Sequence, residues 1–170
     1  MKCLGVDPST KTGLVLFDFS ATDCKVACEV TAPKKYQGLA RAEYLATRVL
    51  EHAQSADMVV IEGLSYASKF VSAVQVEIAI IIRYVLFFHG VKWVDVPPTS
   101  LKKFVTGKGN AKKELIMMEV YKRWQFESKT NNIADAYSLA MFGGALAGLL
   151  DMPKANMAAV KAVKSANDNL

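Results

Sequence analysis

Apolar residues near the start of this chain fall into short runs rather than helical stripes. Residues 3–6 form a brief apolar run, residues 12–19 are largely apolar, and residues 25–31 alternate between apolar and polar positions. These patterns predict three strands. The polar residues 20–23 indicate a hairpin turn between the second and the third strand.

The middle of the chain alternates between helical and extended patterns. Residues 38–54 carry one apolar stripe at helical spacing, and the apolar run 57–61 is typical of a buried strand. Residues 72–88 are apolar on nearly every side of a helix, which indicates burial on more than one face, with a partner as one candidate for the second face. Residues 91–96 predict the next strand, which Pro97 and Pro98 end.

Two further helices are predicted at residues 110–124 and 132–149. The early hairpins imply antiparallel pairing, and the later alternation of strands and helices implies parallel pairing. We therefore expect an α/β fold with one mixed five-stranded sheet flanked by helices on both faces. A length of 170 residues favours one domain, which we place at 1–150. Residues 151–170 are expected to form a flexible or loosely helical tail.

The composition excludes some classes of protein. Apolar residues make up 52% and charged residues 22% of the chain, which is ordinary for a globular protein and not for a disordered one. The most apolar stretch, residues 78–88, is interrupted by Arg83, so we expect no membrane span. The first strand starts too early for a signal peptide, and three cysteines without metal or redox spacing predict reduced thiols in the cytoplasm.

The positive charge of the chain is concentrated in one segment. The net charge is +5, and residues 101–124 alone hold seven basic and two acidic residues, a surplus equal to that of the whole chain. Such a patch is the usual electrostatic footprint of a nucleic-acid-binding surface, although a solvated lysine-rich face has the same composition. The basic residues are Lys102, Lys103, Lys108, Lys112, Lys113, Lys122 and Arg123.

Three acidic residues occupy positions that stability alone does not favour. Asp7 and Glu62 each end an apolar strand, and Asp135 lies within an apolar helix. Each has a simple alternative, respectively a turn residue, a strand-end charge and a partly exposed helix position. If the first and fourth strands are neighbours, however, all three acids can converge. Carboxylates without His or Cys favour hard cations such as magnesium or manganese, and two such ions can hydrolyse a phosphodiester.

Four stretches of the sequence resemble the RuvC family of Holliday-junction resolvases, which has an RNase H-like fold, and the likeness is greatest to bacteriophage-type members. They span about residues 3 to 145 and read GVDPSTKTGLVLFD, VVIEGLSYASK, VPPTSLKKFVTGKGNAKKEL and NNIADAYSLA. The resemblance implies a metal-dependent, structure-selective DNA endonuclease (a crossover junction resolvase) with two magnesium ions per active site, manganese serving as a substitute. Its products would be nicks with 5′-phosphate and 3′-hydroxyl ends.

The resemblance also implies roles for individual residues. Asp7, Glu62 and Asp135 match the metal-binding acids, and Lys102 and Lys113 match the catalytic lysines. Tyr66 would stack on bases at the junction centre, although it could equally be a core aromatic residue. The expected DNA-binding residues are Tyr66, Lys69, Lys103, Lys108 and Lys112.

The sequence departs from the family at one expected ligand. The family has an Asp or His one helical turn before the last acid, where this chain has Asn132 or, one residue earlier, Asn131. An amide oxygen can bind a cation but brings no negative charge. Three explanations stay open: a natural variant, a fourth ligand from elsewhere, or an inactivating substitution.

The expected partners are branched DNA, above all four-way junctions, and a second copy of the chain, since a junction has two symmetric scissile strands. The expected location is the cytoplasm of a bacterial or phage-infected cell. One alternative is a weakened or inactive branched-DNA-binding protein of the same fold. The start DPSTKTG is also similar to a phosphate loop of actin-like ATPases, but the chain is too short for their second domain, and YqgF-type RNA-processing nucleases match fewer of the motifs.

Overall fold

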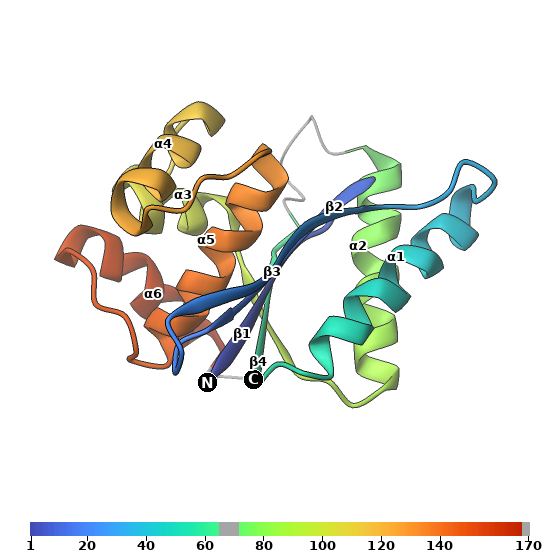
Figure 1. Ribbon diagram of the computed structural model, residues 1–170, viewed down its shortest axis with the longest axis horizontal. Coiled ribbons are helices and arrows are strands. Elements are labelled where there is room, and N and C mark those ends of the chain that lie inside the picture. The colour runs from blue at the N-terminus through green and yellow to red at the C-terminus, as the bar shows by residue number, and fades with distance from the viewer. Residues whose placement is uncertain (65–71, 168–170) are drawn as a thin grey trace.

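The structure, a computed structural model, describes residues 1–64 and 72–167. It contains one mixed sheet in the order β3-β2-β1-β4-β5 (Figure 1). Strands β1, β2 and β3 pair antiparallel, whereas β1 with β4 and β4 with β5 pair parallel. The predicted mixed five-stranded α/β sheet is therefore confirmed. The strands are β1 (Lys2–Asp7), β2 (Lys11–Asp18), β3 (Asp23–Thr31), β4 (Met58–Glu62) and β5 (Trp93–Val96).

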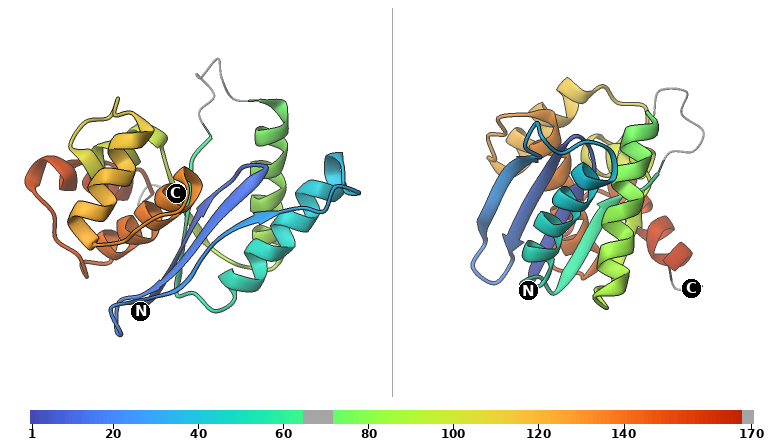
Figure 2. Two further views of the ribbon diagram at one scale, coloured as in Figure 1. Left: turned by 45° about the horizontal axis from the view of Figure 1, so that its top comes forward. Right: turned by 90° about the vertical axis from the view of Figure 1, so that its right-hand side faces the viewer.

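Helices cover both faces of this sheet, as Figures 1 and 2 show. One layer consists of α1 (Gly38–Ala53) and α2 (Ala73–Phe88). The other layer consists of α3 (Pro98–Thr106), α4 (Lys113–Trp124), α5 (Asn131–Leu146) and α6 (Lys154–Asn167). Alternate residues of the strands face the two layers, so that each layer encloses its own apolar core.

Helix α5 lies so close to the sheet that two strand positions have no room for a side chain. A Cβ atom on Gly5 in β1 would overlap with the carbonyl oxygen of Ala136, and one on Gly13 in β2 would overlap with that of Asn132. Backbone-to-backbone packing of this kind requires glycine. It fixes the first two turns of α5 against β1 and β2.

Helix α3 was not expected from the sequence, because the pair Pro97-Pro98 reads as the end of a strand. The helix begins at Pro98 itself, where the missing backbone N–H is not needed for a helical hydrogen bond. Leu101, Phe104 and Val105 then form its buried stripe. Helix α4 starts three residues later than predicted, at Lys113.

The segment expected as a flexible or loosely helical tail forms helix α6, and this helix is packed against α3. Ala159, Val160 and Val163 are buried in the core beneath it. The side-chain Nδ2 of the buried Asn156 donates to the carbonyl oxygen of Phe104 at 2.6 Å. The tail therefore helps to hold the lysine-bearing helix α3 in place.

Helix α2 has one buried face and one open face. Ile78, Ile82 and Leu86 are buried against the sheet and α1. The opposite side exposes large apolar residues, with Phe87 and Phe88 each 73% exposed, together with Ile80 and Tyr84. We call these four residues the α2 outer face. In residues 1–64 and 72–167 no helix is both long and apolar enough to cross a membrane.

Candidate active site

Two carboxylates lie side by side where neighbouring strands end. Strands β1 and β4 are parallel with Val6 opposite Ile61, so Asp7 and Glu62 lie side by side where the two strands end. Asp7 is only 6% exposed, and its carboxyl group is within hydrogen-bonding reach of that of Glu62. The condition on which the convergence of the acids depended, that the first and fourth strands are neighbours, is therefore met. The ends of parallel strands are where open α/β sheets place their sites.

The third carboxylate reaches this place from α5. Asp135 is the fifth residue of that helix and is buried, and the close packing of α5 on Gly5 and Gly13 brings it over the end of β1 and the start of β2. Its charge acts on both Asp7 and Glu62. The three acids predicted from separate parts of the sequence therefore form one electrostatic cluster, which we call the acid cluster.

Burial and mutual repulsion keep protons on this cluster. Desolvation, and then the charges of Glu62 and Asp135, raise the pKa of Asp7 well above its usual range. Desolvation and the charge of Asp135 raise the pKa of Glu62 to about 7, and desolvation raises that of Asp135 to about 6. These upward pKa shifts mean that positive groups of the protein do not fully compensate the negative charge of the ionised cluster.

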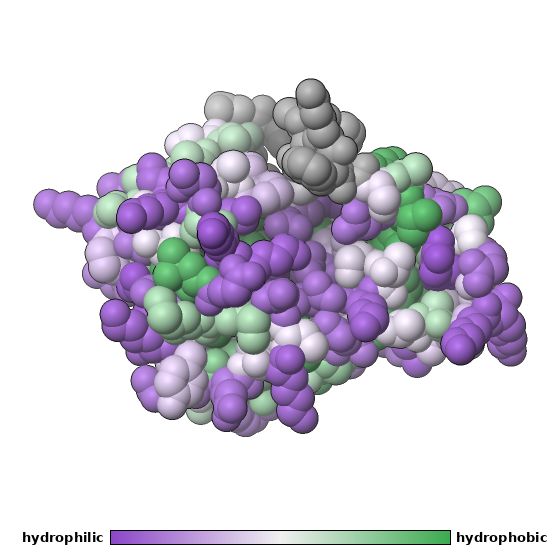
Figure 3. Space-filling model, turned by 90° about the horizontal axis from the view of Figure 1, so that it is seen from above, coloured by the Kyte–Doolittle hydropathy of each residue, from purple (hydrophilic) through white to green (hydrophobic). Residues whose placement is uncertain are grey.

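Two lysines from the basic segment supply part of that charge. Lys113 at the start of α4 lowers the pKa of all three acids, and Lys102 in α3 lowers those of Glu62 and Asp135. The structure thus brings both predicted catalytic lysines into electrostatic range of the cluster. Lys103, Lys108 and Lys112 are exposed on the same α3–α4 segment. Figure 3 views this end of the molecule, where hydrophilic residues cover much of the central surface.

The cluster has the donor chemistry for a hard divalent cation. Asp7, Glu62 and Asp135 offer only carboxylate oxygens, the ligands that magnesium and manganese prefer. Within the described ranges, no three His, Cys, Asp or Glu side chains already converge in the geometry of a metal site. The fit therefore rests on the ligand type and on three acids, two of them buried and Glu62 partly exposed, whose ionised forms a cation would stabilise.

The two asparagines expected near the last acid lie at the first turn of α5. Asn131 is exposed. Asn132 uses its amide group to bridge two strands: Nδ2 donates to the carbonyl oxygen of Lys11 in β2 at 2.9 Å and to the carboxylate of Glu29 in β3 at 2.8 Å. Only the Oδ1 atom of Asn132 is left for a cation. Whether either asparagine binds metal stays a prediction.

Glu29 was not identified from the sequence. It is an ordinary polar position in an alternating strand, and its place beside α5 depends on the pairing of β2 with β3, in which it lies opposite Gly13. No local signal in the sequence reports that register. Tyr66 and Lys69, expected to contact DNA, lie outside the described residues.

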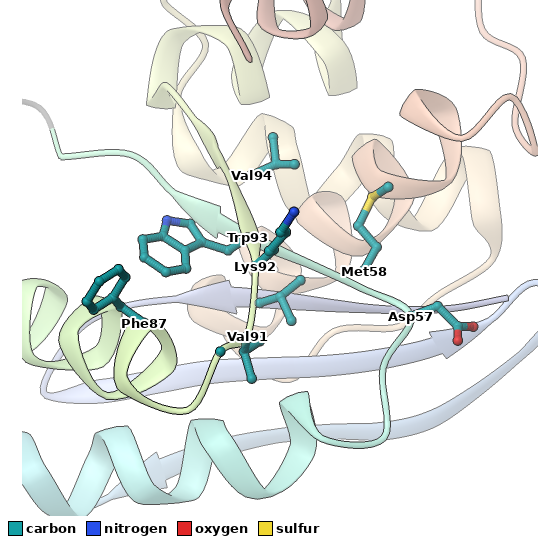
Figure 4. A pocket seen from close by; sticks show the side chains of 9 residues that line it. Asp57, Met58, Phe87, Val91, Lys92, Trp93 and Val94 are labelled. Carbon is teal, nitrogen blue, oxygen red and sulfur yellow. The ribbon is translucent and has the colours of Figure 1, made fainter. Parts of the chain in front are cut away.

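A hollow of about 720 Å³ lies away from the acid cluster, at the free edge of the sheet formed by β5 (Figure 4). It is lined mainly by apolar side chains, among them Met58, Phe87 and Trp93. Met58 and Trp93 are the first residues of β4 and β5, whereas the acid cluster lies where β1 and β4 end. This hollow contains no acidic cluster and is separate from the candidate active site.

The order of the strands and the helices on both faces define an α/β protein of the RNase H-like class. Among solved structures, the chain is similar to Thermus thermophilus RuvC, with a TM-score of 0.68 and 23% identity over 88% of this chain and 98% of that one. It is also similar to T. thermophilus RuvC in complex with a Holliday junction substrate, with a TM-score of 0.66 and 21% identity over 83% of this chain and 91% of that one. The fold is therefore RuvC-like. No protein-family model and no curated protein matches the chain.

Proposed function

We propose that this chain is a metal-dependent endonuclease that resolves Holliday junctions by hydrolytic nicking, with other branched DNA as a further candidate substrate. The observation that carries the proposal is the acid cluster, formed by Asp7, Glu62 and Asp135 from three elements. It lies beside a basic segment in a RuvC-like fold. Three acids packed together, two of them buried, have little value for stability, so a functional use is favoured.

In this proposal the acid cluster holds two magnesium ions, for which manganese can substitute. Bound magnesium would activate a water molecule and stabilise the leaving oxygen of a phosphodiester. Lys113 and Lys102 stabilise the negative charge that develops on the phosphate, because both already act on the cluster electrostatically. Asn132 would add a neutral oxygen ligand through Oδ1, and Asn131 is the other candidate.

The proposed substrate is a four-way DNA junction. Lys103, Lys108 and Lys112 are exposed beside the active-site lysines and would hold flanking phosphates. Such contacts give affinity that falls with salt and depends little on base sequence. A solved neighbour of the same fold is a RuvC bound to a Holliday junction substrate, which supports this class of ligand.

We further propose a homodimer formed through the α2 outer face. Its four large apolar residues form an exposed patch on a helix whose other side is fully packed. A two-fold dimer would offer one acid cluster to each of the two symmetric strands of a junction. The proposed place of action is the cytoplasm of a bacterial or phage-infected cell.

One observation favours a second candidate, a branched-DNA-binding protein that does not cut. Asn132 is held in place by hydrogen bonds to Lys11 and Glu29, and its side chain is neutral. The cluster with Asn132 therefore has one negative charge fewer than a set of four carboxylates. A weaker site for the second ion would reduce or abolish cleavage while leaving the basic segment intact.

A cleavage assay on synthetic four-way junctions, in magnesium and in manganese, tests the proposal. The control variant is Asp7→Asn, and gel-shift binding is measured in parallel without metal. Cleavage by the unmodified chain that is lost in Asp7→Asn supports the endonuclease. Binding without cleavage in either ion supports the second candidate, and absence of binding to any branched DNA contradicts both.

A further inference from the structure

Arg83 connects helix α2 to the end of the strand that carries Glu62. The side chain of Arg83 is 14% exposed although the residue lies in a surface helix. Its Nη2 donates to the main-chain carbonyl oxygen of Glu62 at 2.9 Å, and its Nη1 donates to that of Ala79 at 2.9 Å. A buried arginine with several acceptors is held much more firmly than a solvated one.

The peptide unit between Glu62 and Gly63 is held at both of its ends. Its carbonyl oxygen accepts from Arg83, and its N–H group, on Gly63, donates to the carbonyl oxygen of Val96 at 2.8 Å. Because a peptide unit is planar, two hydrogen bonds at opposite ends fix how it is turned. The direction in which the Glu62 side chain leaves the backbone is then fixed as well.

Arg83 is in turn oriented by strand β5. Its Nε donates to Oδ1 of Asp95 at 3.0 Å, and Nη2 donates to the same oxygen at 2.5 Å. The other oxygen of Asp95 accepts from Nε1 of Trp93 at 3.1 Å. A continuous path of hydrogen bonds, partly charge-assisted, thus runs from Trp93 through Asp95 and Arg83 to the backbone of Glu62.

We propose that Arg83 is a positioning residue for Glu62, oriented by Asp95 and acting through the main-chain carbonyl of Glu62. The inference rests on the proposed function, in which Glu62 binds the catalytic cation. Residues that orient a metal ligand without touching the metal commonly change metal affinity or activity by about 10- to 100-fold. Arg83 is expected to act in this range although it contacts none of the reacting atoms.

The test compares Arg83→Lys and Arg83→Gln with Arg48→Gln. Arg48 also pairs with an acid, Glu51, but on the exposed side of α1, so its replacement removes an ion pair without touching β4. Trp93→Phe is a milder variant, which removes only the last hydrogen bond of the path. The readouts are single-turnover junction cleavage, junction affinity without metal, manganese affinity by calorimetry, and hydrogen exchange of the Gly63 amide by NMR.

Both Arg83 variants should cleave about tenfold more slowly or worse, with junction affinity unchanged. Manganese affinity should fall in parallel, the Gly63 amide should exchange faster, and Trp93→Phe should change each quantity less in the same direction. Arg48→Gln should behave as the unmodified chain. A chain that cuts DNA equally well with and without Arg83 overturns the inference and leaves the proposed function standing.

If the unmodified chain binds junctions but cuts none, the endonuclease proposal fails instead. Manganese affinity and Gly63 exchange then decide the role of Arg83, because neither depends on cleavage. If manganese affinity and Gly63 exchange in Arg83→Lys equal those of the unmodified chain, the positioning role of Arg83 is overturned. A change in both quantities together supports that role.

Discussion

Asn132 donates a hydrogen bond from its side-chain amide to the carboxylate of Glu29, at 2.8 Å. The same nitrogen also donates to the carbonyl oxygen of Lys11. An aspartate at position 132 could make neither bond and would set one carboxylate against another. The hydrogen bonds around this position therefore suit asparagine and not aspartate.

Asn132→Asp should destabilise the metal-free protein by about 1 to 3 kcal/mol, because two acceptors lose their donor and a like-charge contact appears. Urea denaturation at pH 8 measures the loss. Adding Glu29→Gln should recover much of it, since glutamine can donate to the new aspartate. Equal free energies of unfolding for the unmodified chain, Asn132→Asp and the double variant would show that the hydrogen bond between Asn132 and Glu29 does not stabilise the protein.

The acid cluster should make the stability of the metal-free protein fall as pH rises. Glu62 has a folded-state pKa of about 7 and Asp135 one of about 6, both above their ordinary values. Their protonated forms are therefore favoured by folding. The associated stability is complete below about pH 4 and is lost as pH rises to about 7, up to about 3 kcal/mol for Glu62.

Thermal melts between pH 4 and 8, with and without magnesium, check this expectation. Glu62→Gln should flatten the profile, and saturating magnesium should remove most of the loss, because a divalent cation favours the ionised acids. Asp151→Asn, which replaces an exposed acid away from the cluster, is the matched control. A metal-free profile that rises from pH 5 to 8 would contradict the electrostatic description.

Lys113→Met should change the pH dependence of cleavage as well as its rate. Lys113 lowers the pKa of all three acids, so its loss should move the pH midpoint of magnesium-dependent cleavage upward by roughly half a unit or more. The rate should fall by about tenfold or more. Single-turnover cleavage from pH 6 to 9 gives both quantities.

The neighbouring Lys112→Met is the control for that experiment. Lys112 is exposed and is not among the groups that shift the pKa values of the acids. Its loss should weaken junction binding and lower the salt dependence by about one phosphate contact, with the pH midpoint unchanged. Identical pH profiles for the two variants would contradict the proposed catalytic role of Lys113.

Tyr84→Glu should convert a dimer into a monomer, because it places a charge in the middle of the α2 outer face. Tyr84 is 60% exposed, so the fold itself should tolerate the change. Analytical ultracentrifugation over a range of concentrations measures the assembly state. Leu149→Glu, at a similarly exposed apolar residue outside α2, should leave it unaltered, and a monomeric unmodified chain would refute the proposed dimer.

The sequence predicted the sheet and singled out the three acids because both depend on local patterns. Apolar runs or alternating positions identified the strands, and Asp7 and Glu62 stand out because each is a charge that directly follows an apolar run. Asp135 stands out because its neighbours in the helix are apolar. The lysines of the basic segment were visible from charge alone.

Features that depend on pairing in space were not predictable in this way. Glu29 meets Asn132 only through the register of β2 with β3, and Arg83 reads as an interruption of an apolar helix. Helix α3 was hidden because proline at a first helical position and proline after a strand look alike in sequence. Helix α6 mixes alanine and valine with lysine and asparagine, and only its contacts with α3 show that it belongs to the core.

The geometry of the acid cluster depends on two glycine positions at which even a Cβ atom does not fit. Gly5 and Gly13 let the backbone of α5 rest directly on β1 and β2, so no flexible side chain lies between Asp135 and the strand that carries Asp7. Side chains in contact can adapt to small displacements by changing rotamer, whereas two backbones in contact cannot. An attempt to redesign this domain could therefore vary its surface widely and would still fail at these two positions. Protein engineering on this fold should treat both glycines as part of the design of the acid cluster.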